Sequence, residues 1–233
     1  MRVWDIHPGY LNRWSLLGEH REVHALFSII SCGKKGYAHH PETLRWGDNL
    51  WALKMRHELL VSEMVLRGYR HMSPLPGTHP TPWPRQYLNP PCEQFSLLKD
   101  KYHAGEEGRI RLPATVQQLW AQHKYSVLAR NQQLYHSIGR TISDPCREGL
   151  FEEISLTLVE VLRERPSPGG VINALQHMWG YVSKRDDTWG IDREAPGVLV
   201  REIQARALRY RVGYLLESTA LSDLAAWGDT RGV

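Results

Sequence analysis

The chain has 233 residues, with 29 Lys and Arg, 25 Asp and Glu, and 42% hydrophobic residues, which is typical of a globular protein with one large or two small cores. No apolar run approaches the ~20 residues that would cross a bilayer, and polar residues interrupt the first ten positions, where a signal peptide needs its apolar segment. The formal net charge of +4 permits binding to nucleic acid but does not establish it.

The first part of the chain predicts two long helices. Residues 12–32 carry an apolar stripe in which Leu16, Val23 and Ile30 recur every seven positions, before a stop at Gly33. Residues 47–67 show a second helical pattern, with Gly68 as its stop. The segment between them, residues 34–46, is expected to be a basic, polar loop.

A proline-rich segment follows these helices. Seven prolines between Ser73 and Gln94 remove backbone donors and block regular elements, so we expect an extended connection there. A second break is expected at residues 104–114. The domain boundary is placed between the two breaks, after a short helix in residues 92–102, which gives domains over residues 1–100 and 101–233.

The C-terminal domain predicts further helices. Apolar residues recur at helical spacing over residues 116–138, 150–162, 171–182 and 196–216. No segment shows the alternation of a strand, and the Asn-Gly and Asp-Gly pairs of tight hairpins are absent. The predicted fold class is all-α, with two helical modules joined by a proline-rich linker.

The cysteines and histidines do not indicate a metal centre. The three cysteines are far apart and outside any ligand spacing, so we expect reduced thiols in a cytoplasmic protein: Cys32, Cys92 and Cys146. His20 and His24 lie four positions apart on one helix face, but this pair lacks the third ligand that a catalytic zinc needs. We therefore expect no metal and no cofactor, and interpret these histidines as surface or DNA-facing residues.

The chain start and Glu22 offer a different chemistry. An α-amine has a pKa of ~7.7–8.0, so a useful fraction is neutral near pH 7 and can attack a sugar carbon to form a Schiff base. Glu22 lies off the apolar stripe, and its helical neighbours Gly18 and Ala25 leave a notch beside it. A carboxylate there could stabilise positive charge on a sugar and then act as a base. A solvated glutamate on an amphipathic helix is the simpler interpretation of this pattern.

The sequence "MRVWDIHPGYLNRWSLLGEHREVHALF", with Arg2, the Arg21–Glu22 pair and a helix end "RGY" at residues 67–69, resembles the pyrimidine-dimer DNA glycosylases of the phage endonuclease V type. The resemblance covers about residues 1–75. It implies an all-helical DNA repair enzyme in a bacterial or phage-like, nucleoid-associated setting, acting on double-stranded DNA with damaged pyrimidines or abasic sites. It also implies an N-terminal amine as nucleophile and Glu22 as the catalytic glutamate.

Arg2 determines which amine is expected to react. Removal of the initiator methionine normally requires a small second residue, so the nucleophile is expected to be the α-amine of Met1. The residues expected to contact DNA belong to this motif or to the basic loop, where they can meet phosphates: Arg2, His20, Arg21, Lys34, Lys35, His39, His40 and Arg45.

The C-terminal part contains "HKY" at residues 123–125 and "INALQHMWGY" at residues 172–181, and resembles the bacterial YbgA-like domain, which is helical and has no assigned activity. The resemblance covers about residues 112–224. The polar residues of these motifs could line a pocket between helices: His123, Lys124, Tyr125, Asn173, Gln176 and His177. Because His123 lies on the apolar stripe of its helix, a core histidine is the simpler interpretation there.

Three functions are compatible with these observations. The first is a DNA glycosylase with abasic-site lyase activity, acting through Met1 and Glu22. The second is a helical protein that binds nucleic acid without cutting it. The third is a nucleobase-processing enzyme centred on the C-terminal polar residues, with the N-terminal domain as a docking unit. We prefer the first, because chemistry and resemblance agree on Arg2, Arg21 and Glu22.

Overall fold

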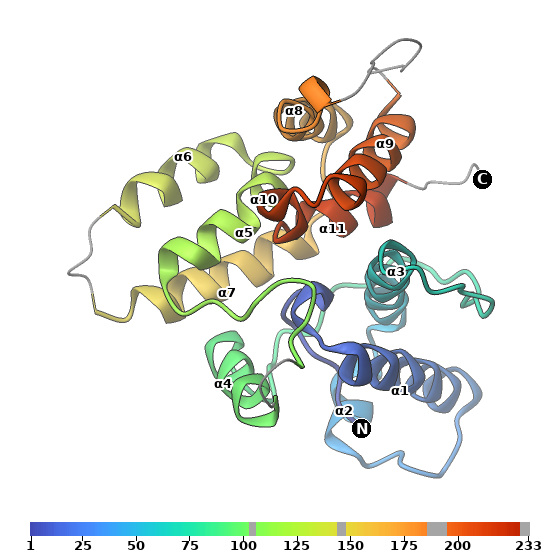
Figure 1. The fold of residues 1–233 in the computed structure, drawn as a ribbon. Helices are drawn as coiled ribbons and strands as arrows, with labels where there is room; N and C mark the ends of the chain where they lie inside the picture. The colour runs from blue at the N-terminus through green and yellow to red at the C-terminus, as the bar shows by residue number, and fades with distance from the viewer. Residues whose placement is uncertain (103–105, 144–147, 186–194, 229–233) are drawn as a thin grey trace. The chain divides into compact units, whose positions relative to one another are not determined.

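The computed structural model describes residues 1–102, 106–143, 148–185 and 195–228. Within these ranges the chain forms eleven α-helices and two short 3₁₀ helices, and no strand (Figure 1). The predicted all-α fold is therefore confirmed. The chain divides into two compact units, residues 1–108 and residues 109–233.

The first unit contains a 3₁₀ helix (Pro8–Tyr10), α1 (Arg13–Cys32), α2 (Pro41–Trp46), α3 (Leu50–Leu66) and α4 (Pro91–Lys101). α1 lies beside α3 and α2 (Figure 1). α1 begins where the Asn12 side chain accepts the backbone N–H of Ser15 at 2.8 Å, and it ends at Gly33, whose φ of 61° suits a glycine. The predicted loop contains α2, because Pro41 suits a first helical turn and the His40 side chain caps it.

The core of the first unit lies between α1 and α3. Leu16, Val23 and Leu26 of α1 are fully buried, as are Leu53 and Leu60 of α3. The seven-residue stripe therefore predicts the buried face of α1 correctly over its first three turns.

The proline-rich segment packs against the first unit. Thr81 Oγ1 accepts the backbone N–H of Trp51 at 3.2 Å, and the Gln86 carbonyl accepts a hydrogen bond from Arg45 at 2.9 Å. Leu75 of this segment is buried. The extended segment thus belongs to the first unit and does more than connect the two.

The first unit also continues past the predicted boundary at residue 100. Tyr102, which follows α4, accepts the backbone N–H of Asn12 at 2.8 Å. The division between the units falls after Gly108. The composition of the linker does not predict this contact, because it joins residues 90 positions apart.

The second unit is built around α5 (Val116–Leu128). α5 contacts four helices of this unit: α6 (Gln132–Thr141), α7 (Leu150–Arg163), α8 (Pro168–Trp179) and α11 (Ala220–Gly228). α9 (Pro196–Arg209) contacts α8, α10 (Gly213–Leu216) and α11. A short 3₁₀ helix spans Ser183–Arg185.

Two of the predicted helical patterns in this unit each form two helices. The pattern over residues 116–138 is divided at Asn131, whose side chain caps α6 by accepting the backbone N–H of Leu134 at 2.9 Å. The pattern over residues 196–216 is divided at Arg211, which has a φ of 48°. No described helix combines the length and apolar character needed to span a membrane. Cys32 and Cys92 are free thiols, and Cys146 lies outside the described residues.

His123 of α5 lies in the core of the second unit. It is 4% exposed, and its Nδ1 lies 2.8 Å from the Leu119 carbonyl, to which it donates as an N–H. Burial lowers the pKa of His123 to about 4, because the charged imidazole would lose its hydration.

We predict that the second unit loses stability as the pH falls from 6.5 toward 4. In this window the unfolded chain protonates His123 near its ordinary pKa of 6.5, whereas the folded unit keeps it neutral. The unfolded state then binds more protons, so the free energy of unfolding falls by up to about 3 kcal/mol. Urea denaturation at pH 7 and pH 4, comparing the natural protein with His123→Gln, measures this. Equal pH dependence in the two proteins would show that His123 is not the cause.

Candidate active site

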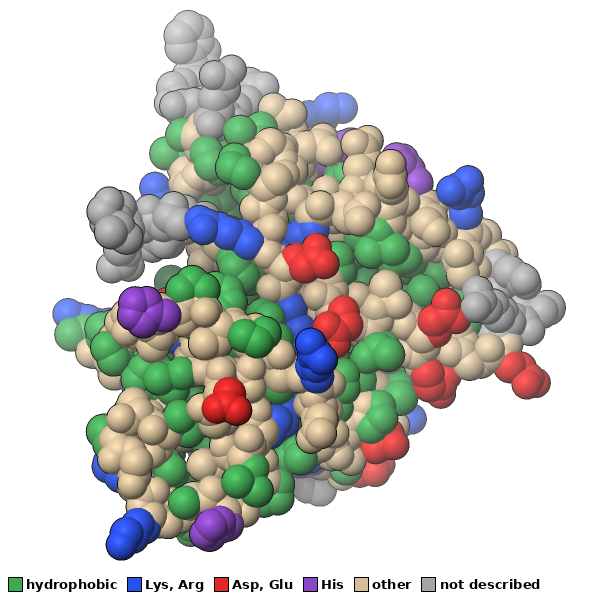
Figure 2. All heavy atoms as spheres, turned by 180° about the vertical axis from the view of Figure 1, so that it is seen from behind, with side chains coloured by type: hydrophobic (Ala, Val, Ile, Leu, Met, Phe, Trp, Pro, Cys, Tyr) green, Lys and Arg blue, Asp and Glu red, His purple; other side chains and the backbone are tan. Residues whose placement is uncertain are grey.

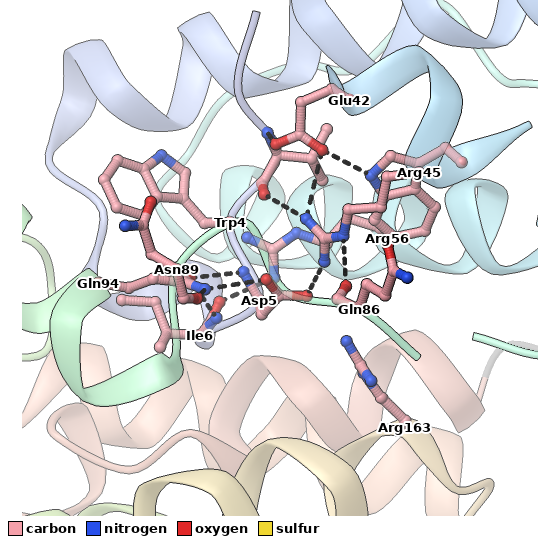
Figure 3. A network of polar contacts seen from close by, with 12 residues as sticks. Trp4, Asp5, Ile6, Glu42, Arg45, Arg56, Gln86, Asn89, Gln94 and Arg163 are labelled. Atoms are coloured by element: carbon pink, nitrogen blue, oxygen red, sulfur yellow. Dashed lines mark hydrogen bonds and ion pairs between the residues drawn. The ribbon is translucent and has the colours of Figure 1, made fainter. Parts of the chain in front are cut away.

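Residues 1–7, here called the N-terminal arm, precede the first 3₁₀ helix and form no regular secondary structure. Side chains from three helices bind its backbone in place of a neighbouring strand. Successive backbone N–H groups donate to side-chain oxygens: Val3 to Glu42 at 2.8 Å, Trp4 to Glu19 at 3.0 Å and Asp5 to Gln94 at 2.8 Å. Figure 3 shows Asp5 beside Gln94. Because buried backbone donors need partners, these three acceptors determine the position of the arm.

A buried ion pair anchors the arm to α1 and α3. The Arg56 guanidinium contacts both carboxylate oxygens of Glu19, at 2.7 and 2.8 Å, and it also donates to the Ile6 carbonyl at 2.8 Å. The side chains of Glu19 and Arg56 are 0% and 3% exposed. Burial raises the pKa of Glu19, and the Arg56 guanidinium acts in the opposite direction.

Arg45 does not lie where the sequence analysis placed it. Predicted to contact DNA, it is instead buried, forms an ion pair with Asp5 and donates to Glu42 at 3.2 Å (Figure 3). Its Nε donates to the Gln86 carbonyl at 2.9 Å. The physical reason is α2, which turns this residue into the core next to the arm. A guanidinium with these partners holds the arm and is not free to meet a phosphate.

The first two residues lie just beyond these contacts. Met1 and Arg2 are half-buried, and the Arg2 guanidinium lies over the Trp4 ring, 4.2 Å from its centroid. The Nε of Arg2 is buried and has no hydrogen-bond partner among the described residues. The structure therefore fixes the backbone from Val3 onward and leaves one donor of Arg2 unused.

Glu22 lies one turn after Glu19 on α1 and is half-buried. Its side chain forms no hydrogen bond or ion pair with any described residue. A Cβ added to Gly18 would meet no atom within 4 Å, and Ala25 is exposed, so the surface beside Glu22 is open. The small residues Gly18 and Ala25 thus leave open surface next to Glu22, whose carboxylate has no partner among the described residues.

The other residues predicted to contact DNA differ in their surroundings. Four are exposed: Arg21, Lys34, Lys35 and His39. Lys34 donates to Ser28 at 2.6 Å, and His40 caps α2. On the face drawn in Figure 2, Lys and Arg side chains are scattered, with Asp and Glu among them, and do not form one basic patch.

His20 belongs to a cluster of four histidines, which is the group among the described residues that could hold a metal ion. His20 and His24 come from α1, His57 from α3, and His71 from the segment after α3. Their candidate ligand nitrogens all lie within 4.8 Å of one another. Burial and the neighbouring imidazoles lower the pKa of His20 to about 4. The structure thus supplies the further ligands that the sequence pair lacked.

The C-terminal polar residues are only partly brought together. Lys124 lies over the rings of Tyr125 and Tyr214, 5.0 Å from each centroid, and Tyr125 donates to the Tyr181 hydroxyl at 3.3 Å. Burial, together with the Tyr181 hydroxyl, raises the pKa of Tyr125. The His177 ring stacks at 6.5 Å from that of Tyr125. Two predicted pocket residues have side chains that form no hydrogen bond or ring contact with described residues: Asn173 and Gln176.

Reasoning from the sequence missed the residues that position the site. Glu19 occupies the apolar stripe of α1, three residues after Leu16, and Arg56 occupies the corresponding stripe of α3, between Leu53 and Leu60. Opposite charges at buried positions of two helices could have indicated an ion pair, because a lone charge is rarely buried.

We predict that Arg56→Met destabilises the first unit by about 3–5 kcal/mol, because it leaves the Glu19 carboxylate buried without its cation. Urea denaturation followed by tryptophan fluorescence measures this change. The matched control is Arg70→Met at an exposed arginine, which should change stability by less than about 0.5 kcal/mol. Equal effects of the two substitutions would contradict the anchoring role of the ion pair.

Comparisons with known proteins assign parts of the chain to two family models. Residues 1–76 match the family model of pyrimidine dimer DNA glycosylase, and residues 124–189 match that of a protein of unknown function (DUF1722). No curated protein and no solved structure matches the chain. The first match spans the arm, α1, α2 and α3, and so includes both Glu19 and Glu22. The two matches confirm the fusion of domains that the sequence resemblances indicated. At the family level, the N-terminal match supports a function in DNA repair as a pyrimidine dimer DNA glycosylase.

Proposed function

We propose that the protein is a DNA glycosylase with abasic-site lyase activity on duplex DNA that contains damaged pyrimidines. The α-amine of Met1 would be the nucleophile and Glu22 the catalytic carboxylate. The observation that carries this proposal is the arm itself, since buried contacts hold it against α1, where Glu22 is unengaged beside an open notch.

Chain geometry supports the approach of Met1 to Glu22. From Trp4 the chain passes through the 3₁₀ helix and returns along α1 to Glu19, which accepts the Trp4 N–H. Three residues span up to ~10 Å, and Glu22 lies ~5 Å beyond Glu19 along the helix axis. These lengths are compatible with the approach of the Met1 α-amine to the Glu22 carboxylate that the proposal requires.

The reaction needs a neutral amine and a carboxylate in turn. The amine lone pair forms a bond to C1′ of the damaged nucleotide while the glycosidic bond breaks. The electron pair of the broken glycosidic bond leaves with the base. Loss of the amine proton and opening of the sugar ring give a Schiff base. Glu22 would stabilise the positive charge that develops on the sugar. It would then accept a proton from C2′, and the C3′–O bond breaks as the strand is cut.

Exposed cations near the chain start provide phosphate contacts in this proposal. Arg21 precedes Glu22 on α1 and is exposed, and the half-buried guanidinium of Arg2 lies over the Trp4 ring. Arginine side chains form strong, charge-assisted hydrogen bonds with phosphate oxygens. Lys34, Lys35 and His39 follow the end of α1 and are exposed. Binding through such contacts should weaken as salt concentration rises, because phosphate neutralisation releases counterions.

We predict that borohydride traps the untagged protein on duplex DNA that contains an abasic site, with the adduct mapped to Met1. Two residues added before Met1 should abolish trapping, because the amine is then displaced from the site. The same two residues added at the C-terminus are the control and should leave trapping intact. Salt-dependent binding without any adduct, with the Met1 amine confirmed free, would favour the protein that binds nucleic acid without cutting it.

We further predict that Glu22→Gln slows cleavage of abasic DNA by about 10²–10⁴-fold, the usual contribution of a general base. Folding should be unchanged, because Glu22 has no partner among the described residues. The matched control is Glu93→Gln on α4, where an exposed glutamate accepts a hydrogen bond from Asn89. A Glu22→Gln rate equal to that of the control would remove Glu22 from the mechanism.

A further inference from the structure

The four histidines converge from three segments of the first unit. Their ring centroids lie 4.7–5.2 Å apart in five of the pairs, which places imidazoles of α1, α3 and the following segment around one point. The closest nitrogens are Nε2 of His57 and Nε2 of His24, 3.2 Å apart. His57 is fully buried, and the other three are half-buried: His20, His24 and His71.

Hydrogen bonding fixes the tautomer of His57 in this cluster, and Ser73 Oγ lies 3.4 Å from Nε2 of both His24 and His71. Nδ1 of His57 lies 3.1 Å from a carboxylate oxygen of Glu58. An ionised carboxylate only accepts, so His57 donates from Nδ1 and, in its neutral form, presents a bare lone pair at Nε2. Nε2 of His20 is buried and has no hydrogen-bond partner among the described residues. A cation at the centre would satisfy both nitrogens.

We propose that His20, His24, His57 and His71 bind one divalent first-row transition metal ion, for which Zn²⁺ is the best fit. Imidazole suits Zn²⁺, whereas Ca²⁺ and Mg²⁺ prefer oxygen ligands. A tetrahedral site with Zn–N bonds of ~2.0–2.1 Å places its nitrogens about 3.3 Å apart. The closest pair already meets this spacing, and the widest must close from at most 4.8 Å.

Glu58 supports the proposed metal site, because it would be the hydrogen-bond partner of a ligating histidine. Ligating histidines commonly donate their other N–H to a carboxylate, which fixes the ring and its tautomer. His57 has this arrangement already. His71 lies outside any helix, so the segment after α3 can supply the movement that closes the site.

Four protein ligands leave no open position, so the site would be structural. It would tie the segment after α3 to α1 and α3. On α1, Glu22 lies two positions from both His20 and His24, and a rotation of ~200° places it on a different face of the helix. The metal site is therefore separate from the proposed catalytic carboxylate, and either proposal can fail without the other.

The test is Zn²⁺ and Co²⁺ titration of untagged full-length protein after chelator treatment. We expect one ion per chain, the visible absorption of tetrahedral Co²⁺, and a melting temperature that rises with Zn²⁺. His24→Asn with His71→Asn, which changes two half-buried ligands, should weaken Zn²⁺ binding by at least about 100-fold and remove the shift. The matched control is His39→Asn with His79→Asn at two exposed histidines, which should bind like the natural protein.

Binding of equal affinity in the natural protein and in the His24/His71 variant would overturn the proposal. So would the absence of a one-to-one complex in the natural protein. Circular dichroism establishes whether the double variant is folded. If it is not, His20→Gln replaces it, since this change removes one half-buried ligand and the same loss of Zn²⁺ affinity is expected. His20→Gln that binds as tightly as the natural protein would also overturn the proposal.

Discussion

The buried ion pair between Glu19 and Arg56 is the interaction on which the N-terminal unit depends. A buried ion pair adds little net stability compared with apolar residues of similar volume. The contribution of this pair is therefore to position the N-terminal arm against α1 and α3. In addition to their ion pair, Glu19 accepts the Trp4 N–H and Arg56 donates to the Ile6 carbonyl. One charged pair thus joins α1, α3 and the arm, which apolar side chains could not do for backbone polar groups.

Residues 19–24 of α1 point in three directions because each is rotated by ~100° from the last. Glu19 faces the core and the arm, and Glu22 lies beside the open notch at Gly18. His20 and His24 contact the histidines of α3 and the segment that follows. The ion pair fixes the rotation of α1 about its axis, and so it sets the direction of all three faces at once.

Local periodicity predicts much of this unit, and long-range pairing explains what it misses. The stripe of Leu16 and Val23 indicates α1 and its buried face, and the notch at Glu22 follows from the spacing of small residues. Glu19 and Arg56 are 37 positions apart, and the contacting nitrogens of His24 and His57 are 33 apart, so neither pair has a local pattern. The basic composition of residues 34–46 predicts a phosphate contact for Arg45, whereas α2 buries this residue beside Asp5.

A nucleophilic chain terminus, as proposed for Met1, has to be fixed in place and remain accessible, and the register of the arm would serve both conditions. A neighbouring strand would have paired the backbone along its whole length and covered the start. Side-chain oxygens instead bind the N–H groups of Val3, Trp4 and Asp5 one by one. The hydrogen bonds therefore stop two residues before the amine, so in the proposed reaction positioning would cost little further entropy and the amine would stay open to a sugar. A shift of this register by one residue would bury the amine or release it, which makes Glu19 and Glu42 as important to the proposed chemistry as Glu22.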